Sequence, residues 1–172
     1  LAVGYRPSHP LPRDEWAHAL ALAARRDLSS FALGLNLSAA FPLSITGDGV
    51  RLSLQRTELR LEGLKQWELG TRVRLGLGLA ASVVFDRRST EQAGEDRAAT
   101  PAAMIPSGGF GALVELQCLF SRHVGGLVAG GADGVPWRTR FVVDDGDAQS
   151  QIGRLFWLNP WLMVGLFTRF GG

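Results

Sequence analysis

The chain of 172 residues contains one cysteine, three histidines and no long apolar run. The single cysteine, Cys118, excludes an internal disulfide framework and a cysteine-rich zinc module. His9, His18 and His123 are scattered and lack the spacing of metal ligands, so we expect no metal site and no cofactor. The longest apolar runs, 75–85 and 156–167, are shorter than the roughly 18 residues that a membrane-spanning helix needs.

Lysine is also nearly absent. Lys65 is the only one among 18 basic residues, which face 16 acidic residues for a net charge of +2. A small net charge spread along the chain is unlike the clustered basic stripe of a nucleic-acid-binding protein. Arginine pairs bidentately with carboxylates and tolerates enclosed ion pairs better than lysine does. The bias therefore indicates enclosed ion pairs, although codon usage in a GC-rich genome would produce the same ratio.

The composition of 46% hydrophobic and 20% charged residues predicts a folded chain, and its length predicts one domain over residues 1–172. Glycine is abundant, at 22 residues, and each interior glycine costs a helix about 1 kcal/mol, so we expect few helices. The chain begins at Leu1 without an initiator methionine or a signal-peptide core. We expect it to be either processed or a fragment.

Alternation of apolar and polar residues with a period of two is the main signal. Between residues 67 and 85 the odd positions are almost all apolar, whereas the even positions are mostly charged or small. The same pattern over 31–45 and 110–120 predicts further long strands. In the segment 50–62 the apolar residues change from even to odd positions near Arg56, which predicts a bulge there.

Turn residues and weaker patterns complete the predicted organisation. Hairpin turns are expected at 46–49 and 62–65, an acidic turn at 144–147, and one long surface loop at 87–109. Asn159-Pro160 either separates the last two strands or kinks one long strand. Residues 14–27 fit an amphipathic helix or a strand, and the neighbouring hairpins favour the strand. Weaker strands are expected over 1–6, 124–129, 137–143 and 149–158.

The length of these strands predicts which side faces lipid. Strands of soluble proteins usually have 5–6 residues, whereas those of transmembrane barrels often extend beyond the bilayer. The apolar face then points to lipid, and the small and charged face fills a narrow lumen. We therefore predict an all-β fold, an antiparallel up-and-down transmembrane β-barrel of about 8 strands, with 10 as the alternative. The residues predicted to form a paired lumen network are Glu68, Arg72, Arg74, Asp86, Glu115, Arg138 and Arg140.

Aromatic residues near the expected strand ends are typical of the interfacial girdles of membrane barrels. These residues are Tyr5, Trp16, Trp67, Trp137, Trp157 and Trp161. The segment 163–170 ends in Phe170, with Val164, Leu166 and Thr168 on the same predicted face. It resembles the terminal-strand signal of bacterial outer-membrane β-barrel proteins, although Gly171 and Gly172 follow the aromatic residue. The resemblance is to the class and implies location in the bacterial outer membrane.

Three functions remain open from the sequence. We favour a structural or interaction role, for example as a subunit of an envelope complex, in which loop 87–109 or the turn 144–147 contacts a protein partner. The alternative enzyme is a lipid-modifying hydrolase that uses Ser121, His123 and Glu115, although their spacing matches no family motif. The third possibility is a soluble lipocalin-like barrel that encloses a hydrophobic ligand. Membrane lipid is an expected partner in the first two cases, and nucleic acid is not expected.

Overall fold

The computed structural model describes residues 1–9, 16–47, 50–92, 102–135, 140–144, 149–154 and 158–170. These residues form strands β1 to β11 and no helix, so none of them forms a helix able to cross a membrane. The strands are β1 (Ala2–Ser8), β2 (Ala17–Leu28), β3 (Phe31–Ala40), β4 (Leu43–Gly47), β5 (Val50–Glu68), β6 (Val73–Gln92), β7 (Ala103–Leu119), β8 (Val124–Gly134), β9 (Arg140–Asp144), β10 (Gln149–Arg154) and β11 (Leu158–Thr168).

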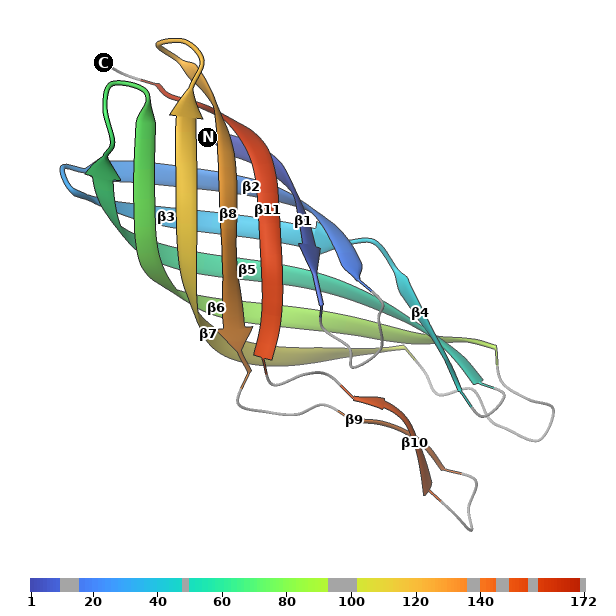
Figure 1. The fold of residues 1–172 in the computed structure, drawn as a ribbon. Coiled ribbons are helices and arrows are strands. Elements are labelled where there is room, and N and C mark those ends of the chain that lie inside the picture. The colour runs from blue at the N-terminus through green and yellow to red at the C-terminus, as the bar shows by residue number, and fades with distance from the viewer. Residues whose placement is uncertain are drawn as a thin grey trace.

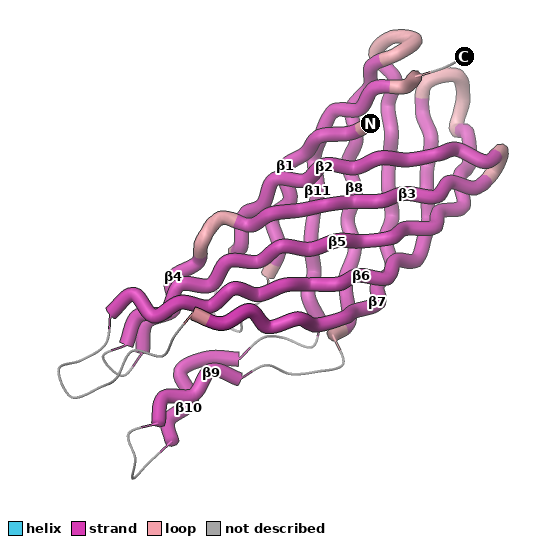
Figure 2. Tube along the Cα trace, turned by 180° about the vertical axis from the view of Figure 1, so that it is seen from behind, coloured by secondary structure: helices cyan, strands magenta, loops and turns pink. Residues whose placement is uncertain are grey.

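The main sheet closes into an eight-stranded antiparallel barrel (Figures 1 and 2). Its order is β3-β2-β1-β11-β8-β7-β6-β5, and pairing of β3 with β5 closes the ring. Strand β4 continues the path of β3 beside β5, and β9 and β10 form a separate two-stranded sheet. The predicted all-β barrel of eight strands is confirmed, and residues 14–27 contain strand β2 rather than a helix.

The two ends of the barrel differ in their connections. Residues 29–30, 69–72 and 120–123 form short turns at one end, where both chain termini also lie (Figure 1). Longer segments, such as 9–16 and 93–102, join the strands at the other end. We call the first of these ends of the barrel the short-turn end and the second the long-loop end. In outer-membrane barrels the short turns face the periplasm and the longer loops face the outside.

The hairpin turn predicted at 62–65 is wrong, because β5 runs through it to Glu68. The turn lies at residues 69–72, where Gly70 adopts a φ of 115° that favours glycine. The alternation of apolar and polar residues gave no sign of this turn. Trp67 and Leu75 are cross-strand partners on the same face, and both are odd-numbered, so the pattern passes through the turn without a break.

The bulge predicted near Arg56 is also wrong. All the even positions of β5 from 50 to 62 are buried or half-buried, so the pleat continues without interruption. What changes along the strand is the polarity of these inward residues, from apolar to charged. The extra residue lies instead in the neighbouring β3–β4 path. Ala39 pairs with Thr57 and Leu43 pairs with Leu54, so a four-residue step (39 to 43) faces a three-residue step (57 to 54). This irregularity turns Leu43 and Ile45 inward, away from the outer face predicted for them.

The long loop predicted at 87–109 is shorter than expected. Strand β6 continues to Gln92 and β7 begins at Ala103, with Arg87 paired to Met104 and Phe85 paired to Pro106. Proline and charged residues suggested a loop, but here they belong to strands that continue past the apolar part of the barrel. Residues 93–101 lie outside the described part of the chain.

The weak strands near the C-terminus form two different structures. The segments 137–143 and 149–158 contribute β9 and β10, which pair with each other and not with the barrel. Asn159-Pro160 lies at the start of β11, where Pro160 pairs with Ala132 of β8. The carbonyl of Pro160 accepts a hydrogen bond from the backbone N–H of His9 at 3.1 Å. The predicted acidic turn at 144–147 falls mostly outside the described residues.

Candidate functional site: the lumen and the two ends of the barrel

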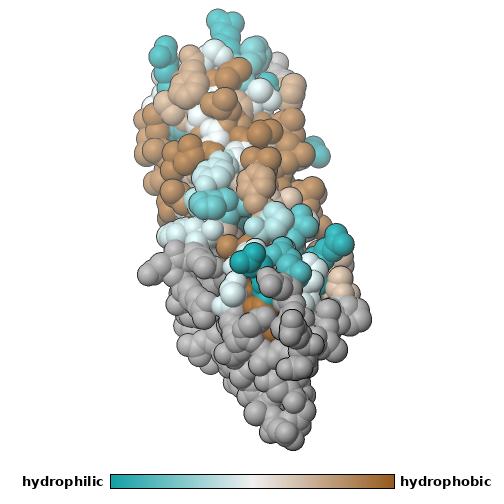
Figure 3. Space-filling model, turned by 90° about the vertical axis from the view of Figure 1, so that its right-hand side faces the viewer, coloured by the Kyte–Doolittle hydropathy of each residue, from teal (hydrophilic) through white to brown (hydrophobic). Residues whose placement is uncertain are grey.

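Exposed apolar residues on all eight strands form a belt around the barrel, and Figure 3 shows one side of this belt as the brown zone. On β6 the outward positions 75 to 85 are apolar, and Leu79 is 72% exposed. Ten steps of about 3.3 Å along a strand tilted by about 40° give a height of about 25 Å, which matches the apolar band of an outer-membrane barrel. The outward apolar face contradicts the lipocalin-like alternative, in which that face would line the interior.

Towards the long-loop end the polarity of the two faces is reversed. Ile45, Val50, Leu52 and Leu54 form a buried apolar cluster on the inner side. The residues between them on β5, Arg51 and Ser53, are exposed or half-buried on the outer side. Apolar residues inside and polar residues outside are typical of a sheet in water, so this part of the barrel extends beyond the bilayer. We call it the extension: β4 with residues 50–55, 86–92 and 103–107 of β5, β6 and β7.

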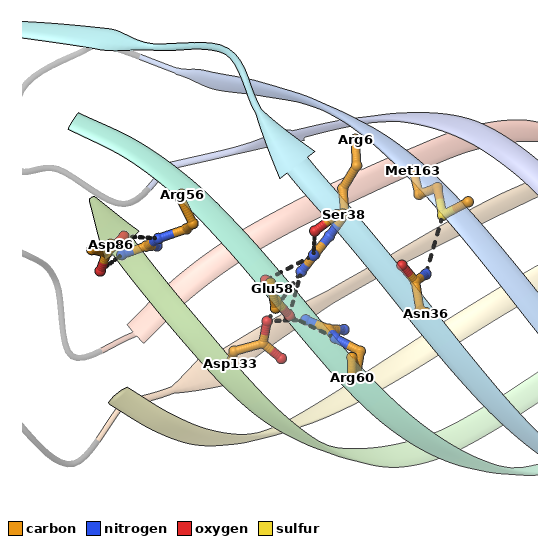
Figure 4. Close-up of polar contacts among 9 residues, drawn as sticks. All are labelled: Arg6, Asn36, Ser38, Arg56, Glu58, Arg60, Asp86, Asp133 and Met163. Carbon is orange, nitrogen blue, oxygen red and sulfur yellow. Dashed lines mark hydrogen bonds and ion pairs between the residues drawn. The ribbon is translucent and has the colours of Figure 1, made fainter. Parts of the chain in front are cut away.

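Inside the belt, four charged residues from β1, β5 and β8 form a buried cluster (Figure 4). Arg6 Nη1 donates to Glu58 Oε2 at 2.8 Å, and Arg60 Nε donates to Glu58 Oε1 at 2.9 Å. Both arginines also pair with Asp133. Two guanidinium groups and two carboxylates make the cluster neutral, which is the condition under which buried charges are tolerated.

Trp161 completes this cluster and corrects the predicted aromatic girdle. Two guanidinium groups lie over its ring, with Arg6 Cζ at 4.7 Å and Arg60 Cζ at 4.4 Å from the ring centroid. Trp161 is 5% exposed and belongs to the interior, whereas Trp16 and Trp67 are exposed as a girdle requires. The side chains of Trp137 and Trp157 lie outside the described residues.

A second ionic cluster lies nearer the short-turn end. Arg25 Nη2 donates to Glu115 Oε2 at 2.6 Å and lies 3.6 Å from Glu62. Gln117 Nε2 donates to the same Glu115 at 2.8 Å. Inward apolar side chains, among them Leu64, Met163 and Phe167, pack around and between the ionic clusters. Side chains therefore fill the middle of the described lumen, as is usual for eight strands.

The structure places the predicted lumen residues in three different settings. Asp86 is buried and pairs with Arg56 (Nε to Oδ1, 2.8 Å), and Glu115 is buried with Arg25. Glu68 and Arg74 pair with each other at the rim of the short-turn end, at 2.7 Å. Arg72 is exposed in the β5–β6 turn, so its predicted inward direction is wrong. The side chains of Arg138 and Arg140 lie outside the described residues.

Most charged residues of the lumen ion pairs were missing from the predicted network. The missing charged residues are Arg6, Arg25, Arg56, Glu58, Arg60, Glu62 and Asp133. The sequence did place Arg56, Glu58, Arg60 and Glu62 on one face, and this run of alternate charges was the signal for the central cluster. Arg6 is the only charged residue of β1, and Asp133 is the only charged residue of the glycine-rich β8. Their contacts with Glu58 and Arg60 of β5 depend on the register of the closed barrel, which the sequence pattern does not show.

The three candidate catalytic residues are not brought together. Ser121 and His123 are exposed in the β7–β8 turn, where Ser121 Oγ accepts hydrogen bonds from the backbone N–H groups of His123 and Val124 at 3.3 and 3.1 Å. Glu115 is buried in the lumen and engaged by Arg25. Within the described part of the chain, no group of three or more His, Cys, Asp or Glu side chains is arranged to hold a metal ion.

A closed antiparallel barrel with an apolar belt outside and paired charges inside defines a transmembrane β-barrel of the bacterial outer-membrane class. The chain is an integral protein of that membrane. No protein-family model and no curated protein sequence matches it.

Solved structures of outer-membrane proteins share this fold. OprG from Pseudomonas aeruginosa is similar with a TM-score of 0.68 and 13% identity, covering 99% of this chain and 94% of OprG. A major outer membrane protein from Thermus thermophilus has a TM-score of 0.67 and 14% identity over 98% of each chain. Ail, the attachment invasion locus protein of Yersinia pestis, was solved with the heparin analogue sucrose octasulfate. It has a TM-score of 0.57 and 11% identity over 98% and 95% of the two chains.

Proposed function

We propose that this barrel is a non-enzymatic membrane anchor that presents the extension as an interaction surface outside the cell. The observation that carries the proposal is the reversed polarity of the extension, which is built as a water-exposed sheet above the belt. The filled lumen supports the same role, because packed side chains leave little room for solute passage. In the sequence, the connection 93–102 joins two strands of the extension, and we include it in the proposed partner contact.

The exposed charges of the extension favour an anionic partner. Arg51 and Arg87 are exposed on the outer face of neighbouring strands. No ion pair joins these arginines to a carboxylate among the described residues. Guanidinium groups bind sulfate and phosphate bidentately. Ail, which shares the fold, was crystallised with a sulfated sugar, and we propose a sulfated or phosphorylated saccharide as the ligand class.

Calorimetric titration of the purified barrel in detergent with sucrose octasulfate tests this proposal. The double substitution Arg51→Gln and Arg87→Gln should weaken binding at least tenfold, and higher salt should weaken binding to the wild type. Arg72→Gln is the matched control, because Arg72 is an exposed arginine at the opposite end. Equal binding by the double variant and the wild type, or equal losses in the control, would contradict an anion site on the extension.

A further inference from the structure

The short-turn end contains a cavity of about 400 Å³ at the mouth of the barrel. Its walls come from the ends of β1, β2, β8 and β11. Ala2, Ala23, Leu127 and Phe167 form an apolar part, and the charged lining residues are Arg25, Arg26, Arg169 and Asp27. This volume lies in the usual range of small-molecule sites, which combine apolar walls with a few polar groups.

The arginines of this mouth are not equally compensated. Arg25 is held by Glu115 and Glu62 in the lumen. Arg169 forms no ion pair with a described residue, and its polar side-chain contact is with Gln117 Oε1 at 3.5 Å. Burial and the neighbouring Arg74 guanidinium lower the pKa of Arg169, which lies beyond the end of β11. The site therefore favours an added negative charge.

The surroundings of the mouth are also basic. Arg26, Arg72, Arg122 and Arg169 have no ion pair with a described carboxylate, whereas Asp27 and Glu68 are both engaged by Arg74. The excess of cations at this end would attract anions by long-range electrostatics, most strongly at low salt.

The apolar wall is shaped by close packing rather than by flexible side chains. The Phe167 ring lies against Gly125, where an added Cβ would approach Phe167 Cζ to 2.4 Å. Phe167 and Leu127 are 7% and 5% exposed, so they form a fixed floor next to the arginines. A ligand that fits both parts needs an anionic head and a short apolar chain.

We propose that the cavity at the short-turn end binds a single-chain anionic amphiphile, such as a fatty acid. Its carboxylate would contact Arg169, and its acyl chain would lie between Ala23, Leu127 and Phe167. The site lies at the opposite end from the extension and does not depend on the function proposed for it.

Photocrosslinking in phosphatidylcholine nanodiscs tests the site, with an octanoate that carries an alkyl diazirine as the probe. Mass spectrometry of the full chain should find labels near Ala23, Leu127 or Phe167. Arg169→Gln should reduce labelling at least tenfold, and Ala23→Phe should abolish it by filling the cavity. Arg122→Gln is the matched control, because it removes an arginine of the same end that does not line the cavity. The faster migration of unheated samples on gels verifies that each variant is folded.

Three outcomes would overturn the proposal. Equal labelling by the matching octanol probe would show that the charge plays no part. Competition by phosphatidylglycerol in the nanodisc, but not by free octanoate, would assign the arginines to a bilayer headgroup. Displacement by an acidic peptide, but not by octanoate, would assign the mouth to a protein partner. Labelling that octanoate displaces and that requires both Arg169 and an open cavity would support the proposal.

Discussion

At the scale of single residues, arginine has a role in this lumen that lysine could not fill. One guanidinium can donate to two acceptors at once and still stack on an aromatic ring. Arg60 does all three, because it contacts Glu58, Asp133 and the face of Trp161 while only 1% of its surface is exposed. The arginine bias of the sequence thus has a structural use, whatever its origin.

Glu58 is the residue on which the central cluster depends most. The change Glu58→Gln keeps the side-chain shape but leaves Asp133 as the one carboxylate paired with Arg6 and Arg60 among the described residues. We expect a loss of about 3–5 kcal/mol in the free energy of unfolding, because one buried positive charge is left without compensation. Urea unfolding in lipid vesicles, followed by tryptophan fluorescence, measures this loss.

Glu68→Gln is the control for this prediction. Glu68 also pairs with an arginine, but 68% of its side chain is exposed at the rim. Exposed ion pairs contribute about 1 kcal/mol or less, so this change should have little effect. Equal losses from both substitutions would show that the central cluster is hydrated rather than buried.

At the scale of the strand, the direction of apolar residues changes along the length of a single element. Strand β5 carries apolar residues inward at Val50 to Leu54 and outward at Leu59 and Leu61. The change marks the level at which water replaces lipid outside the barrel. A strand that crosses two solvents needs no bulge to change its pattern, because the environment of each face changes instead.

This interpretation gives opposite expectations for two positions on the outer face of β6. Leu79→Arg lies near the middle of the belt and should cost about 2–4 kcal/mol in the free energy of unfolding. Ser89→Arg lies on the same face in the extension and should cost less than about 1 kcal/mol. Urea titrations of the two refolded variants measure both values. A larger loss at Ser89 would contradict the assignment of the extension to water.

Period-two alternation was sufficient to predict the long strands and the lipid-facing side, because lipid imposes one rule on every outward position of the belt. It could not locate the β5–β6 turn, since Gly63 and Gly70 are equally good turn residues in the sequence, and the choice depends on pairing with β3. The change from apolar to charged inward residues along β5 was also interpreted wrongly as a bulge. Partners such as Arg6 and Glu58, 52 residues apart, follow only from the closed register.

At the scale of the whole molecule, the barrel is joined along two seams that hold its N-terminal and C-terminal halves together. Strand β6 pairs with β7 through sixteen residue pairs, from Val73↔Cys118 to Arg88↔Ala103. Strand β1 pairs with β11 and completes the ring on the other side. In the sequence, the segment 93–101 links β6 to β7, the two strands of the first seam. None of the residue pairs of either seam includes it.

Cleavage within this segment should therefore leave the barrel closed. Arg97 is a trypsin site in 93–101, a segment without strand alternation, whereas Lys65 lies in the middle of the paired part of β5. Brief trypsin treatment of the folded protein should cut after Arg97 before it cuts after Lys65. The fragments 1–97 and 98–172 should migrate together without heating and separate after boiling, because both seams persist. Mass spectrometry of the earliest product identifies the site. First cleavage at Lys65, or separation of the fragments without heating, would contradict the register of β5 or the strength of the two seams.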